Sequence, residues 1–286
     1  MRILLIGASG QLGRDLYLAF RSEEVIPVDH QELEISDEAA VQRCLDAARP
    51  ECILNTAAFH PLAKCEREPA RALAVNAAGP AYLARAAERH GAILVHFSTD
   101  YVFNGTKRSP YVETDAPAPL SLYAISKLAG EWALRQYCEK HFLIRTSTLF
   151  GRGPTSSARE NFVEGMLRLA GQGQPIRVAS DQMRSPTSTR DLAEKLVMLV
   201  HSRAYGLYHM TNSGGCSWYE FAQEIFRQAR LAPQVLATTS EELGIGTRRP
   251  KYSVLDHAAL RAAGFLDLPS WQEALAVYLR QRSREQ

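Results

Sequence analysis

The chain has 286 residues, of which 46% are hydrophobic and 22% charged, and its formal net charge is +2. This composition is typical of a globular protein with one large or two modest domains, and the scattered Lys and Arg residues predict no nucleic-acid groove. Five cysteines without a Cys-x-x-Cys pair favour a reducing compartment over a disulfide framework or zinc site. No apolar stretch approaches the ~18 residues of a membrane span, and the N-terminus does not resemble a signal peptide. We therefore expect a cytoplasmic protein with no membrane partner.

The N-terminus predicts a dinucleotide site. Residues 2–6 are an apolar run typical of a strand buried in a parallel sheet. A glycine-rich turn follows and opens an amphipathic helix to about Phe20. Glycine permits the tight turn, and backbone N–H groups can then approach a pyrophosphate at the helix N-terminus. The order of strand, glycines and helix predicts cofactor contacts from Gly7, Ser9, Gly10, Gln11, Leu12 and Gly13.

The second predicted strand, residues 25–29, ends in a carboxylate about 20 residues after this turn. Asp29 can accept hydrogen bonds from the adenosine ribose, which slightly favours NADH over NADPH because a carboxylate repels a 2′-phosphate. His30 would soften this preference if it were charged. Glu34 and Ile35 are further predicted cofactor contacts, and Asp37 or the preceding serine is expected to cap the next helix.

The third predicted strand, residues 51–54, leads into a segment of small residues. Ala57 and Ala58 would let the backbone run close beneath a cofactor, so both are predicted to bind it. His60 in the following loop is a predicted substrate contact, although a plain loop histidine is the alternative. A long helix is expected over residues 69–90, where Asn76 has a predicted structural role.

Polar residues follow the fourth predicted strand, residues 92–97. Ligands of open parallel sheets bind beyond the carboxyl ends of the strands. Thr99 is therefore placed to donate a hydrogen bond to a substrate oxygen, with Ser98 toward the cofactor and Asp100 and Tyr101 toward the substrate. The long loop over residues 104–119 is typical of a binding element or lid.

Tyr123 and Lys127 are four residues apart, which on a helix places both on one face. A free phenol has a pKa of roughly 10, and a neighbouring ammonium lowers that pKa toward neutrality. The pair predicts proton donation, whereas a surface tyrosine beside a solvated lysine is the alternative. An apolar stripe on another side of the helix is expected to pack inward; it consists of Ile125, Leu128, Ala129 and Trp132.

After the fifth predicted strand, residues 141–145, a Gly/Pro/Ser-rich connection spans residues 151–157 and the alternation of strands and helices changes. Helices are expected over residues 161–170, 217–230 and 270–282. The pattern predicts an α/β fold: a Rossmann-like, doubly wound parallel sheet over residues 1–150, which binds the dinucleotide, and a smaller C-terminal α/β substrate lobe over residues 151–286, with some elements crossing back.

The glycine turn, the hydroxyl residue ending the fourth strand and the Tyr-x-x-x-Lys pair together resemble the extended short-chain dehydrogenase/reductases. Four further segments resemble the dTDP-4-dehydrorhamnose reductase family: Ser98-Thr-Asp-Tyr-Val-Phe103, Tyr123-x-x-x-Lys-Leu-Ala-Gly-Glu131, Arg145-Thr-Ser147 and Asp181-Gln-x-x-x-Pro-Thr187. The resemblance implies NAD(P)H-dependent reduction of the 4-keto group of a nucleotide-linked sugar. It further implies that Tyr123 gives the proton, that Lys127 lowers the pKa of Tyr123 and holds the nicotinamide ribose, and that Thr99 polarises the carbonyl.

The sequence departs from this family around the expected sugar pocket. Thr148 occupies a position where the family commonly has an aromatic residue, and His60 and its neighbours replace a Thr and a Val-Asp pair. Thr148 and Asn161 are nonetheless predicted substrate contacts, and the identity of the sugar stays open. No carboxylate cluster for magnesium can be assembled, so no metal is predicted, and a homodimer is a possible assembly.

Two other functions remain open from the sequence. The regulatory subunit of methionine adenosyltransferase resembles the same family, binds a dinucleotide and acts through a partner. A sugar-nucleotide epimerase or dehydratase is the second alternative. Tyr101 stands where dehydratases usually have a glutamate, which counts against dehydration.

Overall fold

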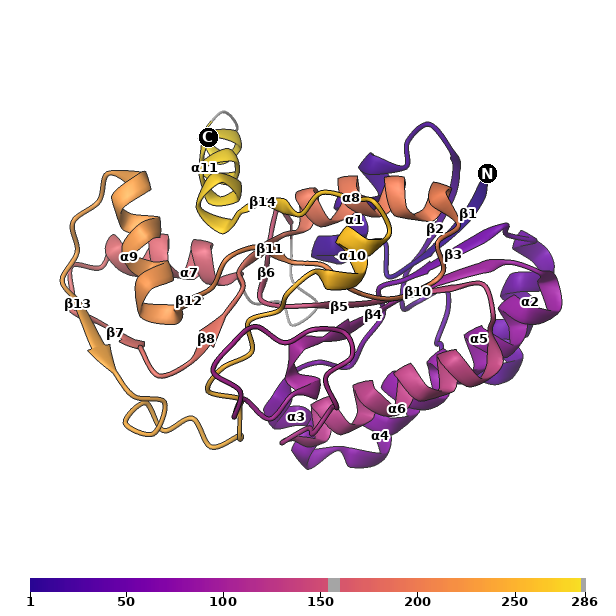
Figure 1. Ribbon diagram of the computed structural model, residues 1–286, viewed down its shortest axis with the longest axis horizontal. Coiled ribbons are helices and arrows are strands. Elements are labelled where there is room, and N and C mark those ends of the chain that lie inside the picture. The colour runs from indigo at the N-terminus through magenta and orange to yellow at the C-terminus, as the bar shows by residue number, and fades with distance from the viewer. Residues whose placement is uncertain (154–159, 284–286) are drawn as a thin grey trace.

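The computed structural model describes residues 1–153 and 160–283, and a six-stranded parallel sheet lies at its centre (Figure 1). The strand order is β10-β5-β4-β3-β1-β2. Because β2 and β3 pair on opposite sides of β1, the carboxyl ends of β1 and β3 form the switch point at which such sheets bind ligands. The predicted fold class is confirmed. The strands are β1 (Arg2–Ile6), β2 (Glu24–Val28), β3 (Cys52–Asn55), β4 (Ile93–Thr99), β5 (His141–Thr146) and β10 (Gly206–His209).

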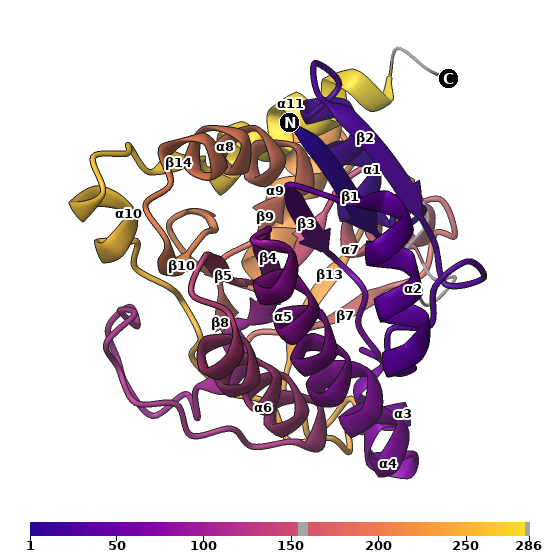
Figure 2. The same cartoon turned by 90° about the vertical axis from the view of Figure 1, so that its right-hand side faces the viewer.

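Helices cover both faces of this sheet (Figure 2). On one face, α1 (Gln11–Ala19) and α8 (Thr189–Ser202) pack against each other and bury residues such as Leu16 and Leu196. The other face is covered by α2 (Glu38–Ala48), α5 (Gly79–His90) and α6 (Leu122–Tyr137). This double cover explains why β1 and β3 are nearly all apolar. None of the described helices is long and apolar enough to cross a membrane.

The single helix predicted over residues 69–90 is interrupted. The chain forms α3 (Leu62–Arg67), α4 (Pro69–Leu73), a π-helical turn over Ala74–Ala78 and then α5. Pro80 has no N–H to donate to the carbonyl of Asn76, so the regular helical bond is missing there. The side chain of Asn76 instead donates to the Phe59 carbonyl at 2.8 Å and to the Ser126 hydroxyl at 3.0 Å. The predicted structural role of Asn76 is confirmed.

The second lobe contains α7 (Phe162–Ala170), α9 (Trp218–Ala229) and α11 (Trp271–Arg282), together with the parallel pair β7 (Ile176–Ala179) and β13 (Val235–Thr238). Phe221 and Trp271 lie in its core. However, β10 and α8, both after residue 150, belong to the first lobe (Figure 1). The domain boundary at residue 150 stays a prediction, with the expected crossing back. Residues 154–159 of the predicted connection lie outside the described residues.

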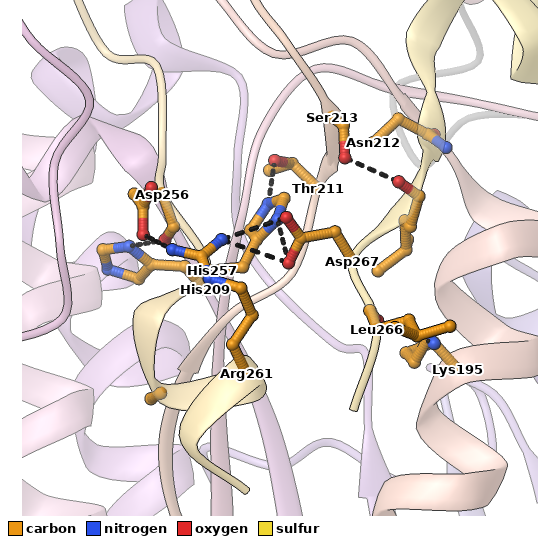
Figure 3. A network of polar contacts seen from close by, with 12 residues as sticks. Lys195, His209, Thr211, Asn212, Ser213, Asp256, His257, Arg261, Leu266 and Asp267 are labelled. Atoms are coloured by element: carbon orange, nitrogen blue, oxygen red, sulfur yellow. Dashed lines mark hydrogen bonds and ion pairs between the residues drawn. The ribbon is translucent and has the colours of Figure 1, made fainter. Parts of the chain in front are cut away.

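A polar network joins the C-terminal segment to the end of β10 (Figure 3). His257, just before α10 (Ala258–Ala262), contacts the Thr211 hydroxyl at 2.8 Å and Asp267 at 3.4 Å. Arg261 pairs with Asp267 at 3.0 Å and with Asp256. These contacts hold the segment that follows α10 beside the sheet and so fix where the second lobe is attached. The other short strands are β6 (Leu149–Phe150), β8 (Met183–Arg184), β9 (Thr187–Ser188), β11 (Asn212–Ser213), β12 (Cys216–Ser217) and β14 (Leu268–Ser270).

Candidate active site

The glycine turn between β1 and α1 forms a cradle that side chains would fill. Gly7 has φ +80°, and a Cβ at Gly13 would lie 2.2 Å from the Gly7 carbonyl oxygen. Among the described residues, no side chain caps α1 at Gly10, so the first N–H groups of this nine-residue helix have no side-chain acceptor. This positive helix end fits the pyrophosphate of a dinucleotide.

Two of the predicted cofactor contacts in this turn have structural side chains. The buried amide of Gln11 donates to the Gly151 carbonyl at 2.8 Å, which joins the turn to the start of the second lobe. Leu12 packs into the core beneath α1. Only the backbone N–H groups of Gln11 and Leu12 remain for a cofactor. Backbone N–H groups are the donors that a glycine-rich turn is expected to offer a pyrophosphate. Their cofactor contacts stay predictions, as do those of Ser9 and Ala58.

The end of β2 is tied into a short turn. Asp29 accepts a hydrogen bond of 2.8 Å from the N–H of Gln31, and Glu34 accepts from the N–H and hydroxyl of Ser36. Ile35 is 2% exposed, packs in the core and lies against Gly79, so its contact with an adenine stays a prediction. Asp37 caps α2 by accepting from the N–H of Ala40, which confirms that prediction.

Thr99, Tyr123 and Lys127 come together at the carboxyl edge of the sheet. Thr99 is the last residue of β4, and Ser121 caps α6 so that Tyr123 lies in its first turn. The hydroxyl of Thr99 lies close enough to the phenol of Tyr123 to lower its pKa, and it donates to the carboxylate of Asp100 at 3.1 Å. Lys127, which is 2% exposed, donates to the Phe97 carbonyl at 2.6 Å. The residues predicted to carry the chemistry are therefore grouped, whereas their roles stay predictions.

The pKa of Tyr123 differs from the expectation of a lowered value. Burial raises the pKa of this phenol well above its ordinary value, although the nearby hydroxyl of Thr99 opposes the shift. Burial also lowers the pKa of Lys127 to about 8, while the carboxylate of Glu131 raises it. The prediction that an ammonium lowers the phenol pKa is wrong for this structure, because desolvation dominates both groups. A phenol that stays protonated at neutral pH is suited to donating a proton.

The predicted orientation of α6 is wrong in part: Leu128 of the apolar stripe is buried as predicted, but two of its other members are not. Ile125 and Trp132 are 46% and 61% exposed, whereas Lys127 and Glu131 lie on the buried side of the helix. Two charges can be buried here because each has partners, and Arg145 on β5 pairs with Glu131 at 2.6 Å. The catalytic face and the sheet-facing side of α6 are therefore the same side.

Glu131 was not among the predicted site residues, yet it organises the floor of the site. It accepts hydrogen bonds from Arg145 and from the hydroxyl of Ser98, the residue before Thr99. Its spacing of four residues from Lys127 was the available signal, because that spacing places both side chains on one helical face. His96, which contacts Lys127, and Asn55, which contacts His96, carried no such signal.

Asp100 and Tyr101, in a 3₁₀ turn over Asp100–Val102, lie beside the catalytic trio. The ring of Tyr101 meets that of Tyr123 edge-on with centroids 6.2 Å apart, and its hydroxyl accepts from Arg184 at 3.1 Å. Asp100 is 2% exposed and accepts from Ser147 at 2.8 Å. Their contact with a substrate stays a prediction, and Asp100 visibly serves to hold the surrounding segments.

The remaining predicted substrate residues are dispersed. His60 lies close enough to Lys127 for their charges to interact, and burial lowers the pKa of His60. Thr148 has φ +40° and its hydroxyl lies 3.3 Å from that of Ser147. Asn161 caps α7 and donates to Gly151 and Tyr278, so its side chain is engaged in structure. Within residues 1–153 and 160–283, no group of three or more His, Cys, Asp or Glu side chains is arranged to hold a metal ion.

A glycine cradle at the switch point, beside a Thr–Tyr–Lys trio at the same sheet edge, defines a dinucleotide-binding protein of the Rossmann type with the polar trio of a short-chain reductase. The family model described as RmlD substrate binding domain matches residues 1–284. The chain belongs to this family, that of the dTDP-4-dehydrorhamnose reductases, which confirms the family predicted from its motifs.

Characterised relatives span nearly the whole chain. It is 42% identical to the spore coat polysaccharide biosynthesis protein SpsK of Bacillus subtilis (strain 168), over 99% of this chain and 98% of the relative. It is 39% identical to the dTDP-4-dehydrorhamnose reductase of Streptomyces griseus, over 96% and 91%. The crystal structure of dTDP-4-dehydrorhamnose reductase from Bacillus anthracis with NADP is similar with a TM-score of 0.94 and 39% identity, over 98% and 99%. The complex with NADP gives no support to the predicted slight preference for NADH.

Proposed function

We propose that the protein uses NAD(P)H to reduce the 4-keto group of a nucleotide-linked 4-keto-6-deoxy sugar, with dTDP-4-dehydrorhamnose as the leading candidate. The observation that carries this proposal is the grouping of two hydroxyls, those of Thr99 and Tyr123, with Lys127 at the carboxyl edge of the sheet. The membership of the chain in a reductase family supports the same reaction.

The reaction requires a hydride on the carbonyl carbon and a proton on the carbonyl oxygen. A reduced nicotinamide supplies the hydride when bound. Tyr123 is the candidate proton donor because its phenol is protonated at neutral pH and lies in the first turn of α6, beside Thr99. Thr99, which ends β4 beside the same phenol, would donate to the developing alkoxide, where a positioned donor stabilises the new charge. Lys127 would hold the nicotinamide ribose.

Either nicotinamide cofactor is compatible with the proposal. The glycine cradle fits the pyrophosphate common to both, and Asp29 lies at the end of β2 where the adenosine ribose is expected. Binding of NADP by the Bacillus anthracis relative supports NADPH as a working cofactor here. A cytoplasmic location and a homodimer also belong to this proposal; cell fractionation and analytical ultracentrifugation test them.

The test is NADPH and NADH oxidation measured against a panel of nucleotide-linked 4-keto-6-deoxy sugars, with the product's C4 configuration determined by NMR. We expect turnover with dTDP-4-dehydrorhamnose or a close analogue, and no turnover with 4-hydroxy sugars. Tyr137→Phe, on the exposed end of α6, is the matched control and should keep full activity. Absence of turnover with every keto-sugar, together with co-purification of a methionine adenosyltransferase, would favour a regulatory subunit instead.

A further inference from the structure

Three buried side chains from three elements form a chain of contacts beneath the active site. Asn55 ends β3, His96 lies within β4 and Lys127 lies on α6, and each is at most 2% exposed. The amide nitrogen of Asn55 is 3.1 Å from Nδ1 of His96, and Nε2 of His96 is 3.3 Å from Nζ of Lys127. Nζ of Lys127 also donates to the Phe97 carbonyl at 2.6 Å.

The orientation of the Asn55 amide follows from its other contact. Its oxygen is 3.1 Å from the backbone nitrogen of Ala57, which can only donate. The atom facing that N–H must therefore be the amide oxygen, which leaves the NH₂ group facing His96. Nδ1 of His96 is then an acceptor and carries no proton.

The tautomer of His96 follows in turn. Burial keeps the pKa of this imidazole well below its usual value, so the ring is neutral and holds one proton. With Nδ1 accepting, that proton is on Nε2, where it points at Lys127. A protonated lysine has three donors and no lone pair, so it would meet Nε2–H donor to donor. An uncharged amine has one lone pair and can accept this hydrogen bond while it donates to Phe97.

We propose that His96 is a positioning residue for Lys127: its Nε2–H donates to the uncharged amine and so stabilises that form relative to the ammonium. The contacts then run in one direction, from the N–H of Ala57 through Asn55 and His96 to Lys127 and the Phe97 carbonyl. When Lys127 is protonated it can only donate, so Nε2 of His96 must become an acceptor. The proton of the ring then moves to Nδ1, where it meets the NH₂ group of Asn55, and that hydrogen bond or the one between Asn55 and Ala57 is lost. Burial shifts the pKa of Lys127 in the same direction, to about 8, so the uncharged form becomes the main one only above that pH.

The other charged groups near Lys127 act in both directions. The carboxylate of Glu131, one turn later on α6, favours the ammonium. His60, in the loop after β3, is close enough to interact with the charge of Lys127 and disfavours it when protonated. Glu131 is itself paired with Arg145. Because Glu131 and His60 act in opposite directions on the charge state of Lys127, the contribution of His96 adds to the difference between them. The inference rests on the proposed function only in that it concerns the residue assigned to hold the ribose.

The tautomer is directly measurable in the free, ¹⁵N-labelled protein by long-range ¹H–¹⁵N NMR correlation of the histidine rings at pH 9, above the Lys127 pKa of about 8. The resonances of His96 are assigned by their loss in His96→Gln. We expect Nε2 to carry the proton and Nδ1 to carry none. A proton on Nδ1, or an imidazolium, would overturn the inference. This measurement needs no substrate and no cofactor, and His96→Gln is the only variant that it uses.

A second measurement follows the titration of Lys127 through its ¹³Cε chemical shift, assigned with Lys127→Met. In His96→Gln the new carbonyl can accept from the ammonium, so the pKa of Lys127 should rise by about one unit. His141→Gln, a half-buried histidine on β5 outside the site, is the control and should leave the titration unchanged. An unshifted Lys127 in His96→Gln would overturn the inference. Inactivity toward all keto-sugars with the expected tautomer would instead count against the proposed function alone.

Discussion

The carboxylate of Asp100 accepts a hydrogen bond of 2.6 Å from the hydroxyl of Ser253, although 153 residues separate them in the sequence. Ser253 lies on the segment between β13 and α10, and Asp100 is the direct neighbour of Thr99. Arg184, on β8 of the second lobe, adds a favourable charge interaction with the same carboxylate. The residue beside the catalytic threonine thus joins the two lobes where the chemistry is expected to occur.

Replacing Ser253 by Ala should therefore destabilise the protein. The buried carboxylate of Asp100 would lose one of its donors, and hydrogen bonds to charged buried groups contribute about 1–3 kcal/mol. Urea denaturation should give a free energy of unfolding lower by about this amount. Ser283→Ala removes a hydroxyl bonded to Leu279 on the exposed end of α11 and is the control. Equal losses in both variants would contradict the role given to Asp100.

Tyr123→Phe should reduce kcat by about a thousandfold, because general acid catalysis contributes on the order of 10²–10⁴. Cofactor affinity, measured by quenching of protein fluorescence, should stay within a factor of two or so, because the phenol oxygen is not needed for burial of the ring. Normal turnover in the variant would remove Tyr123 as the proton donor. Thr99→Val should also lower kcat, and Thr99→Ser should restore part of it.

Two glycine substitutions should affect different properties: one should weaken cofactor binding, and the other should stabilise the fold. A Cβ at Gly13 would lie 2.2 Å from the Gly7 carbonyl and 2.8 Å from Cα of Ala8, so Gly13→Ala should distort the cradle and weaken cofactor binding at least tenfold (~1.4 kcal/mol). Gly165 lies within α7 with open space around its Cα. Gly165→Ala should leave cofactor affinity unchanged and raise the free energy of unfolding by about 0.5–1 kcal/mol. Calorimetric titration and urea denaturation measure the two effects.

Asp29→Ala should improve the use of NADPH relative to NADH. Removal of the carboxylate at the end of β2 relieves its repulsion of a 2′-phosphate and also removes an acceptor for the ribose hydroxyls. The ratio of kcat/KM for the two cofactors is the readout. Glu32→Ala, on the same turn, is the control, because its carboxylate accepts the Asp29 N–H. An unaltered ratio in Asp29→Ala would show that another residue governs this choice.

Much of the fold follows from local pattern, whereas the orientation of buried polar groups does not. Apolar runs ending in small or polar residues predicted the first five parallel strands to within about two residues, and the Gly7 turn identified the cofactor edge. The direction of α6 was wrong in part because Ile125 and Trp132 are the obvious apolar residues, while Lys127 and Glu131 are buried through partners on other strands. Such pairing is nonlocal and leaves no periodic signal.

The π-helical turn and His96 are two further features that depend on contacts between distant residues and could not be predicted from the local sequence. Pro69 indicated the start of one long helix, and nothing in the local sequence revealed that Asn76 would bond to Phe59 and Ser126. His96 lies within an otherwise apolar strand, where a buried histidine is ordinarily structural. Its importance appears only once Asn55 and Lys127 are found on either side of its ring.

His209 should make the protein less stable in mild acid. It is fully buried, and burial, with the nearby Arg145, lowers its pKa to about 3. Its Nδ1 lies 3.1 Å from the carbonyls of Tyr111 and Asp256, and its Nε2 has no partner among the described residues. In the unfolded chain an ordinary histidine takes up a proton near pH 6.5, whereas the folded protein resists protonation down to about pH 3.

The resulting stability is fully present above pH 6.5 and is lost as the pH falls from there toward the folded pKa, by up to about 1.4 kcal/mol per pH unit. His209→Gln keeps a donor for the two carbonyls and removes the titration, so the free energy of unfolding should depend less steeply on pH between 6.5 and roughly 4.5. His30→Gln, whose side chain is 74% exposed, should leave the slope unchanged. Urea denaturation at a series of pH values decides the matter, and an identical slope in His209→Gln and the parent protein would exclude His209 as the titrating group.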